Sequence, residues 1–369
     1  MEPVVNPYRQ ALPPPIRSSG IVGWIRSNFF SGWVNTVITL ILLWVVIQFL
    51  TFVINWAFID AVWVGESADA CPDQGSACWA FVIGRWRLFV YGLYPQEILW
   101  RVNIVYLLAI MTVAAFVFSF GKYTKTVRIT MIVVFPVATI IFLLGGIFGM
   151  KPVSTESFGG LLLTLVVATT GIFGSIPLGL LLALGRASEL TVIRRICTIF
   201  IEFWRGIPLI VAIVMFVALL PIFIPDGSKI DVVARVFIAF AAFNSAYMAE
   251  VFRGGLQSIP AGQFEAAKSI GFSYWKMMIY IILPQAIKNA VPALVNSCIS
   301  IFKETTLILL VGFSDFLGII QLSLQDPDWI GPPHIFASAY IFAALVYFVF
   351  TFGMSRYSVR LENRSNIDG

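Results

Sequence analysis

EAAKSIGFSYWKMMIYIILP, residues 265–284, is the stretch that decides the fold of this 369-residue chain. The stretch begins with polar residues, carries Lys268 and Lys276, and holds a single glycine, Gly271. Long apolar runs flank it on both sides, so it is a polar connection between two membrane-crossing segments. A glycine inside such a connection predicts a break between two short helices.

The composition of the chain indicates a membrane protein. Hydrophobic residues make up 59% of it, charged residues only 12%, and the mean hydropathy is +0.91. A soluble domain carries roughly twice that share of charge. Several apolar runs reach the ~20 residues that a bilayer-crossing helix needs. Backbone groups in lipid must bond to one another, so these runs predict an all-α integral membrane protein.

Eight membrane-crossing helices are expected. They are punctuated by glycine, proline and charged residues. The expected ranges are 33–58, 100–120, 129–149, 159–184, 206–224, 232–252, 285–303 and 335–354.

The distribution of basic residues predicts the orientation. Seventeen Lys and Arg residues fall in the alternate connections on one side, and four fall on the other. The four are Arg85, Arg87, Lys151 and Lys229, and three more near span ends (Arg101, Arg235, Lys303) are left uncounted. Basic residues favour the cytoplasmic side, so both termini and the 265–284 loop are expected there. The +5 net charge is scattered between apolar runs, which argues against nucleic acid as a partner.

The connection 60–98 then faces outward. It contains Cys71 and Cys78, for which a disulfide is feasible in an oxidising compartment, the alternative being two unpaired thiols. Its apolar, aromatic segment 79–95 is expected to lie on the membrane surface. His334 is the single histidine and no CxxC pair occurs, so no metal or haem site is expected.

A composition shift near residue 155 divides the chain. The first three spans carry few polar residues and read as a peripheral, lipid-facing addition, whereas later spans hold most polar groups. The expected parts are a cytoplasmic tail 1–32, a three-helix extension 33–155, a core 156–355 with a cytoplasmic loop 251–284, and a tail 356–369.

The cytoplasmic loop predicts a helix–glycine–helix knob. Helix six is expected to end at 253–255, a short helix to cover 263–270, and Ser273 to cap a second helix. Ala266 and Ala267 leave room for close approach, and Glu265 is suited to contact a partner or brace the loop. The alternative is an ordinary helical hairpin. The residues expected to make the partner contact are Glu265, Ala266, Ala267, Ser269, Gly271 and Phe272.

These residues match the EAA signature of ABC importer permeases, and three further segments narrow the resemblance. They are GLLLTLVVATTGIFGSIPLGLLLALGR at 160–186, IEFWRGIPLI at 201–210 and AYMAEVFRGGLQSIPAGQFEAA at 246–267. Residues 159–354 resemble the five-helix core of type I importers of the polar amino acid (His/Glu/Gln/Arg/opine) permease family. The longer N-terminal half more loosely resembles the M-type permease of general L-amino-acid (Aap/Bzt-type) importers.

The resemblance implies a transport subunit of a bacterial inner membrane rather than an enzyme. A second, homologous permease would share the path, and a periplasmic binding protein would deliver the amino acid. Two cytoplasmic ATPases would grip the knob and switch the permease between two packed states. ATP and Mg²⁺ would bind those ATPases, because this chain has no GxxxxGK[ST] loop.

Polar and ionisable residues inside spans are candidates for the substrate path. They are Asn244, Ser245, Glu250, Asn296, Ser300, Lys303 and Glu304, with Ser297, Glu202 and Arg205 as further possibilities. The structural alternatives are a pair between Glu250 and Arg253 at the membrane surface and a simple helix end at 303–304.

Two features qualify this assignment. Many family members read RGTPLLVQ where this chain has Ile207 and Ala212, which suggests that this subunit contacts substrate less than its partner does. The outer segment 323–334 offers Trp329 as an anchor for the binding protein, the alternative being a plain loop.

Two other functions, a secondary transporter and a membrane-embedded enzyme, fit the sequence less well. A secondary transporter would couple amino acid movement to protons through Glu250 or Glu304, but such folds show paired repeats that are not evident here. A membrane-embedded enzyme lacks a plausible constellation of catalytic groups.

Overall fold

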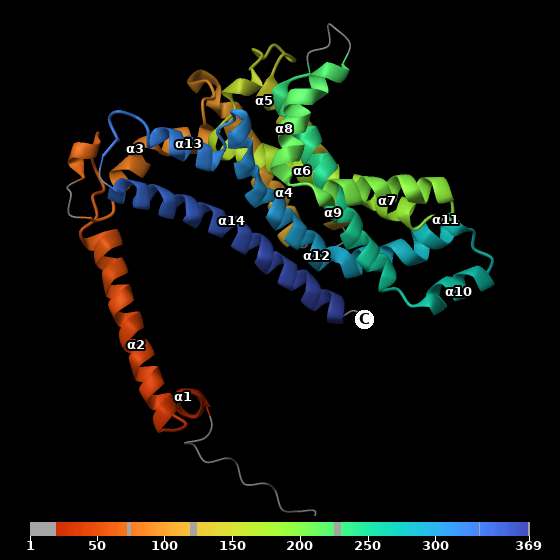
Figure 1. Ribbon diagram of the computed structural model, residues 1–369, viewed down its shortest axis with the longest axis horizontal. Coiled ribbons are helices and arrows are strands. Elements are labelled where there is room, and N and C mark those ends of the chain that lie inside the picture. Colours follow the sequence, from red (N-terminus) through yellow and green to blue (C-terminus); the bar gives the residue numbers. More distant parts are fainter. Residues whose placement is uncertain (1–19, 72–74, 119–123, 225–229, 332, 368–369) are drawn as a thin grey trace, which may run out of the picture.

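The computed structural model describes residues 20–71, 75–118, 124–224, 230–331 and 333–367 (Figure 1). Expectations about the tail 1–19, Lys122, Lys229 and the last two residues lie outside these ranges. The described chain consists of helices joined by short connections. The expected all-α membrane architecture is therefore confirmed.

Seven described helical segments are long and apolar enough to cross a membrane. Their principal helices are α2 (Trp33–Ile54), α4 (Leu99–Val117), α5 (Thr124–Leu144), α6 (Gly160–Arg186), α9 (Val232–Gln257), α12 (Leu283–Glu304) and α14 (Pro333–Ile367).

The remaining expected span, 206–224, corresponds to Leu209–Phe223 and is preceded by a sharp bend. Helix α7 (Thr191–Gly206) precedes it, and α8 (Leu209–Leu219) follows after a bend of 106°. Pro208 stands between them; it lacks an N–H and disfavours helix at Ile207, so the chain turns here. The helical segment therefore starts three residues later than expected, and the helix α7 before it was not expected. Eight crossings are reached only when this bent pair counts as one.

Helices α6 and α9 form the closest helix pair of the described bundle. At Gly179 a Cβ atom would lie 2.5 Å from the Cβ of Met248, so only glycine permits this approach. Small residues are the usual device for close helix packing in membranes. Helix α9 also runs five residues past its expected end, to Gln257, and Gly255 packs against the backbone of Ala286 on α12.

One face of helix α3 (Trp79–Tyr91) is buried against the body of the protein. It packs with α6, α14 and α13 (Phe316–Ser323), and its Arg85 forms an ion pair with Asp326. Trp329 is only 3% exposed and its ring lies 5.3 Å from that of Phe81. The expectation of a free Trp329 anchor is therefore wrong. Ile83 and Trp86 leave the other face of α3 exposed, so the expected position of 79–95 on the membrane surface stays a prediction.

Two local features fix the end of the molecule that carries α3 and α13. Cys71 and Cys78 form a disulfide in the structure. Asp315 begins α13, where one carboxylate oxygen accepts the Gly318 N–H at 2.9 Å and the other accepts the Tyr347 hydroxyl at 3.0 Å. Because the carboxyl is fully buried, desolvation raises the pKa of Asp315. These bonds tie α13 to α14.

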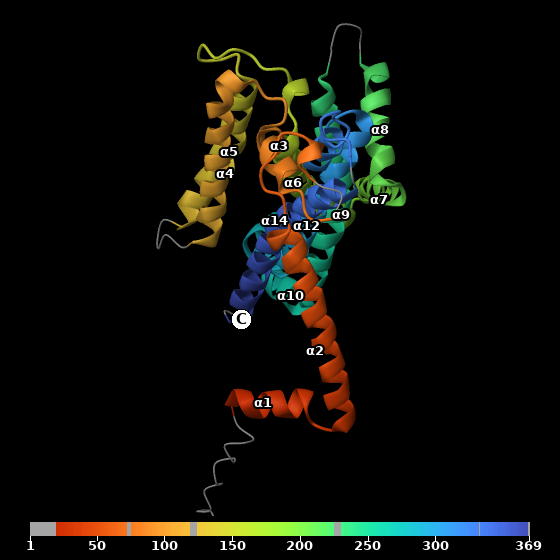
Figure 2. The same cartoon turned by 90° about the vertical axis from the view of Figure 1, so that its left-hand side faces the viewer.

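The extension expected to face lipid divides into two kinds of helix. Helix α2 runs away from the body in both views and has no buried residue among those described (Figures 1 and 2). Helices α4 and α5 pair with each other, and Val105 and Leu143 join the main buried cluster with α6 and α9. Helix α2 is the more detached part, and α4 and α5 remain largely exposed beside the core.

Candidate functional site

The connection between α9 and α12 forms a knob at one end of the bundle. It consists of α10 (Ala261–Ser269), Gly271, and α11 (Tyr274–Met277), which leads through Met278–Ile282 into α12. Figure 1 shows α10 and α11 at the edge farthest from α3 and α13. The predicted helix–glycine–helix shape is confirmed.

Gly271 ends the first helix through a defined capping motif. Its φ is +79°, a left-handed conformation that residues with a Cβ rarely adopt. The Gly271 N–H donates to the Lys268 carbonyl at 2.9 Å, and the Phe272 N–H donates to the Ala267 carbonyl at 3.1 Å. This pair of bonds is the Schellman arrangement, which satisfies the last carbonyls of a helix. The chain thereby reverses without leaving those carbonyls unpaired.

The two alanines of the knob face opposite ways. Ala266 is exposed together with Glu265, whereas Ala267 is 1% exposed and packs in a cluster that includes Met277 and Ile282. The expectation that Ala267 leaves room for an approaching partner is therefore wrong, because its small side chain admits the neighbouring helix of this same chain.

The other predicted contact residues are partly internal. Ser269 donates its hydroxyl to the Glu265 carbonyl at 2.9 Å, and Phe272 is half-buried in the same cluster as Ala267. Ser273 begins α11 as predicted, but its side chain makes no capping hydrogen bond.

An exposed apolar surface accompanies the polar face of the knob. Ile270 is 69% exposed and Trp275 is 64% exposed, and Tyr274 adds an exposed ring beside them. Large apolar side chains left uncovered in a polar connection are typical of a docking surface. Sequence reasoning missed Ile270 and Trp275, although their place within a polar loop was the available signal.

An ionic network lies where α6, α7 and α9 meet. Glu250 accepts from Arg186 at 2.6 Å and from Arg253 at 2.8 Å, and Glu202 lies 3.1 Å from the same Arg186 nitrogen. Arg205 stands farther off, 3.9 Å from Glu250. The expected pairing of Glu250 with Arg253 is confirmed, whereas Arg186 was missed because its partners lie on other helices.

Two polar contacts carry the network toward the knob. Arg253 donates to the Gln257 side chain at 2.7 Å on the last turn of α9. One residue later, the Ser258 hydroxyl accepts from the Asn289 amide at 2.8 Å, which joins the start of the knob to α12. The knob is therefore anchored to α9 and α12, and through Glu250 to α6.

The core of the chain matches a known protein family. Residues 175–366, from the middle of α6 to the end of α14, match the family described as binding-protein-dependent transport system inner membrane component. The chain belongs to this family. It is thus a multi-pass inner-membrane permease subunit.

Individual relatives extend the match over the whole chain. The inner membrane amino-acid ABC transporter permease protein YhdY of Escherichia coli is 41% identical over 349 residues, which cover 95% of this chain and 94% of YhdY. The glutamate/glutamine/aspartate/asparagine transport system permease protein BztC of Rhodobacter capsulatus is 33% identical, with 96% of each chain covered. A crystal structure of an amino acid ABC transporter with histidines is 33% identical over 56% of this chain and 92% of its own, with a TM-score of 0.49.

The residues predicted for the substrate path lie in three different settings within the permease. Asn244 and Ser245 are buried, and their side chains donate to carbonyls of their own helix, those of Phe240 and Ala242. Glu250 belongs to the ionic network. The α12 residues Asn296, Ser300 and Lys303 are exposed, and Glu304 is half-buried.

Ile207 and Ala212, the two residues from which weaker substrate contact was expected, are packed inside the chain. Ala212 is fully buried in the main cluster, and Ile207 is half-buried against the same cluster. An alanine at 212 therefore fits an apolar interior in this subunit.

Proposed function

We propose that this chain is one of two permease subunits of an ATP-driven amino acid importer, with the knob at 261–277 as its contact to the motor. The observation that carries the proposal is the knob itself. It combines a rigid, glycine-capped turn with an uncovered surface of Glu265, Ala266, Ile270 and Trp275. A surface of this kind suits a groove on another protein.

Energy for transport comes from that other protein. The chain has no phosphate-binding GxxxxGK[ST] loop, so ATP and Mg²⁺ bind two cytoplasmic ATPase subunits rather than this one. The chain contributes no catalysis. Closure of the ATPases moves the knob, and the ionic network around Glu250 transmits the movement to α6 and α9 as a rigid-body switch.

The cargo is an amino acid, as the names of the relatives YhdY and BztC suggest. A periplasmic binding protein delivers it, and a homologous second permease completes the path. The exposed polar residues of α12, Asn296, Ser300 and Lys303, face that path and offer hydrogen bonds and a positive charge to the amino acid. Glu304 flanks them at the end of the helix.

The excess of basic residues on the side of the knob supports a cytoplasmic position for the knob and for both termini. The opposite end of the bundle, with α3, α13 and the Cys71–Cys78 pair, then faces the periplasm, where a disulfide persists.

Reconstitution into liposomes tests the proposal. The chain, its partner permease and the ATPase are incorporated together, ATP is enclosed, and the binding protein is supplied outside with a labelled amino acid. We expect ATP-dependent uptake that unlabelled substrate amino acids suppress when all twenty are compared. Uptake by the chain alone, driven by a proton or sodium gradient, would contradict the proposal and support a secondary transporter.

A further inference from the structure

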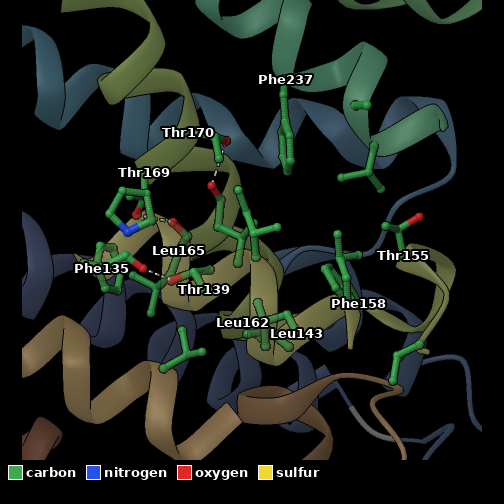
Figure 3. Close-up of a pocket in the computed structure, with 18 of the residues that line it drawn as sticks. Phe135, Thr139, Leu143, Thr155, Phe158, Leu162, Leu165, Thr169, Thr170 and Phe237 are labelled. Atoms are coloured by element: carbon green, nitrogen blue, oxygen red, sulfur yellow. Dashed lines mark hydrogen bonds between the residues drawn. The ribbon is translucent and has the colours of Figure 1, made fainter. Parts of the chain in front are cut away.

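A cavity of about 410 Å³ lies between the α4–α5 pair and the α6–α9 pair (Figure 3). This volume is in the range of ~300–1,000 Å³ found for small-molecule sites. It is distinct from the knob and from the polar residues of α12, because its lining comes from α4, α5, the connection before α6, and the α6 and α9 helices.

The walls of the cavity are apolar. Phe135, Leu143, Leu162 and Phe237 line it together with three threonines of α5 and α6 (Figure 3). Each threonine hydroxyl donates to a carbonyl of its own helix, three or four residues earlier. The bonds run from Thr139 to Phe135 at 2.8 Å, from Thr169 to Leu165 at 2.6 Å and from Thr170 to Val166 at 2.8 Å. The cavity therefore presents little that would hold water.

The cavity lies among candidate membrane-crossing helices and is partly open at the protein surface. All four helices around it are candidate spans, and Ile140 on its rim is exposed. Figure 2 shows the α4–α5 pair beside the rest of the bundle, and these two helices pack more closely on each other than on α6 or α9. Hydrocarbon is the solvent that surrounds such a rim, so a hydrocarbon chain is the natural occupant.

One end of the cavity is polar. Thr155 donates its hydroxyl to the Asp231 carboxylate at 2.6 Å, and the other oxygen of Asp231 accepts the Val233 N–H at 2.9 Å at the start of α9. Ser154 lies on the same rim. An apolar interior with one polar end matches an amphiphile.

We propose that this cavity holds an acyl chain of a membrane phospholipid, with the head group at the Ser154–Thr155–Asp231 end. The lipid fills the space between the N-terminal hairpin and the core and so attaches α4 and α5 to the permease. The inference depends on the fold alone and not on the transport function proposed above.

Photolabelling in nanodiscs tests the site. The full chain is reconstituted with a phospholipid that carries a diazirine on its acyl chain, irradiated, and mapped by mass spectrometry. We expect adducts concentrated on the cavity-lining residues of α5 and α6, several-fold above those on α2, whose surface faces bulk lipid.

Cavity-filling variants give the matched comparison. Ala109→Phe on α4 and Ala234→Phe on α9 fill the cavity from opposite walls and should each lower labelling there at least threefold. Ile110→Phe and Ile238→Phe change exposed neighbours outside the lining and should leave labelling unchanged.

Two results would overturn the proposal. One is labelling of the cavity no higher than that of α2 in the unaltered chain, a readout that does not depend on how the variants fold. The other is loss of labelling on addition of a water-soluble amino acid, which would make the cavity part of a substrate path.

Discussion

Single residues decide the shape of the knob, and Gly271 is the foremost of them. A Cβ added there would meet no described atom within 4 Å, so the position needs glycine for its φ of +79° and not for space. A residue with a Cβ pays roughly 1–2 kcal/mol in that conformation. The turn after α10 therefore depends on glycine alone.

Gly271→Ala should alter the exit from α10 while leaving membrane insertion intact. We expect a loss of most ATP-driven uptake and of substrate-stimulated ATPase activity in the reconstituted complex. Gly262→Ala is the matched control, because Gly262 lies within α10 at an ordinary φ and a Cβ there also meets no described atom. Equal activity of the two variants would contradict a role of this turn in coupling.

Glu250 is the second decisive residue, because it is the acceptor shared by Arg186 and Arg253. Glu250→Gln removes its charge, so Arg253 loses its carboxylate partner and Arg186 keeps only Glu202. We expect a loss of about 2 kcal/mol of stability, the scale of a hydrogen bond to a charged group. A double-mutant cycle with Arg186→Gln, read by thermal unfolding in detergent, should show coupling between the two sites. Strictly additive effects would contradict the network, and the exposed Glu97→Gln should have little effect.

At the scale of elements, the segment around the Cys71–Cys78 pair is held onto α14. The Cys78 N–H donates to the buried Ser338 hydroxyl of α14 at 2.8 Å, so the end of this short loop is fixed to the core. Because a disulfide restricts the unfolded chain, its loss should cost about 2 kcal/mol.

The oxidation state of these cysteines is directly measurable. In membranes prepared without reductant and then denatured in SDS, we expect a maleimide mass tag to react at 71 and 78 only after reduction. In the Cys71→Ser variant, Cys78, which is buried in the folded chain, should react after denaturation without any reductant. Labelling of both thiols in the unreduced chain would show that the pair is open in the membrane.

Elements also show how far the sequence could predict the structure. The knob was predictable because its capping motif is local, with the donor and acceptor residues all within 267–272. The packing of one face of α3 against the core was not predictable, because Phe81 is covered by Trp329, which lies far away in the sequence. An aromatic segment between spans has the same pattern whether lipid or protein covers it.

The same distinction applies to the candidate site. Glu250 and Arg253 are three residues apart on one helix, so their pairing follows from helix geometry. Arg186 reaches Glu250 from α6, and only tertiary packing brings it there. The bend before α8 had a local signal in Pro208, but a count of apolar residues does not detect a bend.

At the scale of the whole molecule, the ends of the bundle differ in character. One end is closed by α3, α13 and the buried Asp315, whereas the other carries the knob with its uncovered apolar surface. The central claim is that a separate ATPase drives this permease through that knob. Ala266 is exposed on the knob, whereas the adjacent Ala267 is buried. A contact with the ATPase should therefore reach the first and not the second.

Site-directed cross-linking to the ATPase tests this claim most directly. Ala266→Cys and Ala267→Cys are made separately in a chain with Cys197→Ala and Cys298→Ala, and each is co-expressed with the ATPase and treated with a short thiol-to-amine cross-linker. We predict a cross-linked permease–ATPase product for Ala266→Cys, altered in yield by ATP, and none for Ala267→Cys. Failure of Ala266→Cys to cross-link in a complex that still transports would contradict the account.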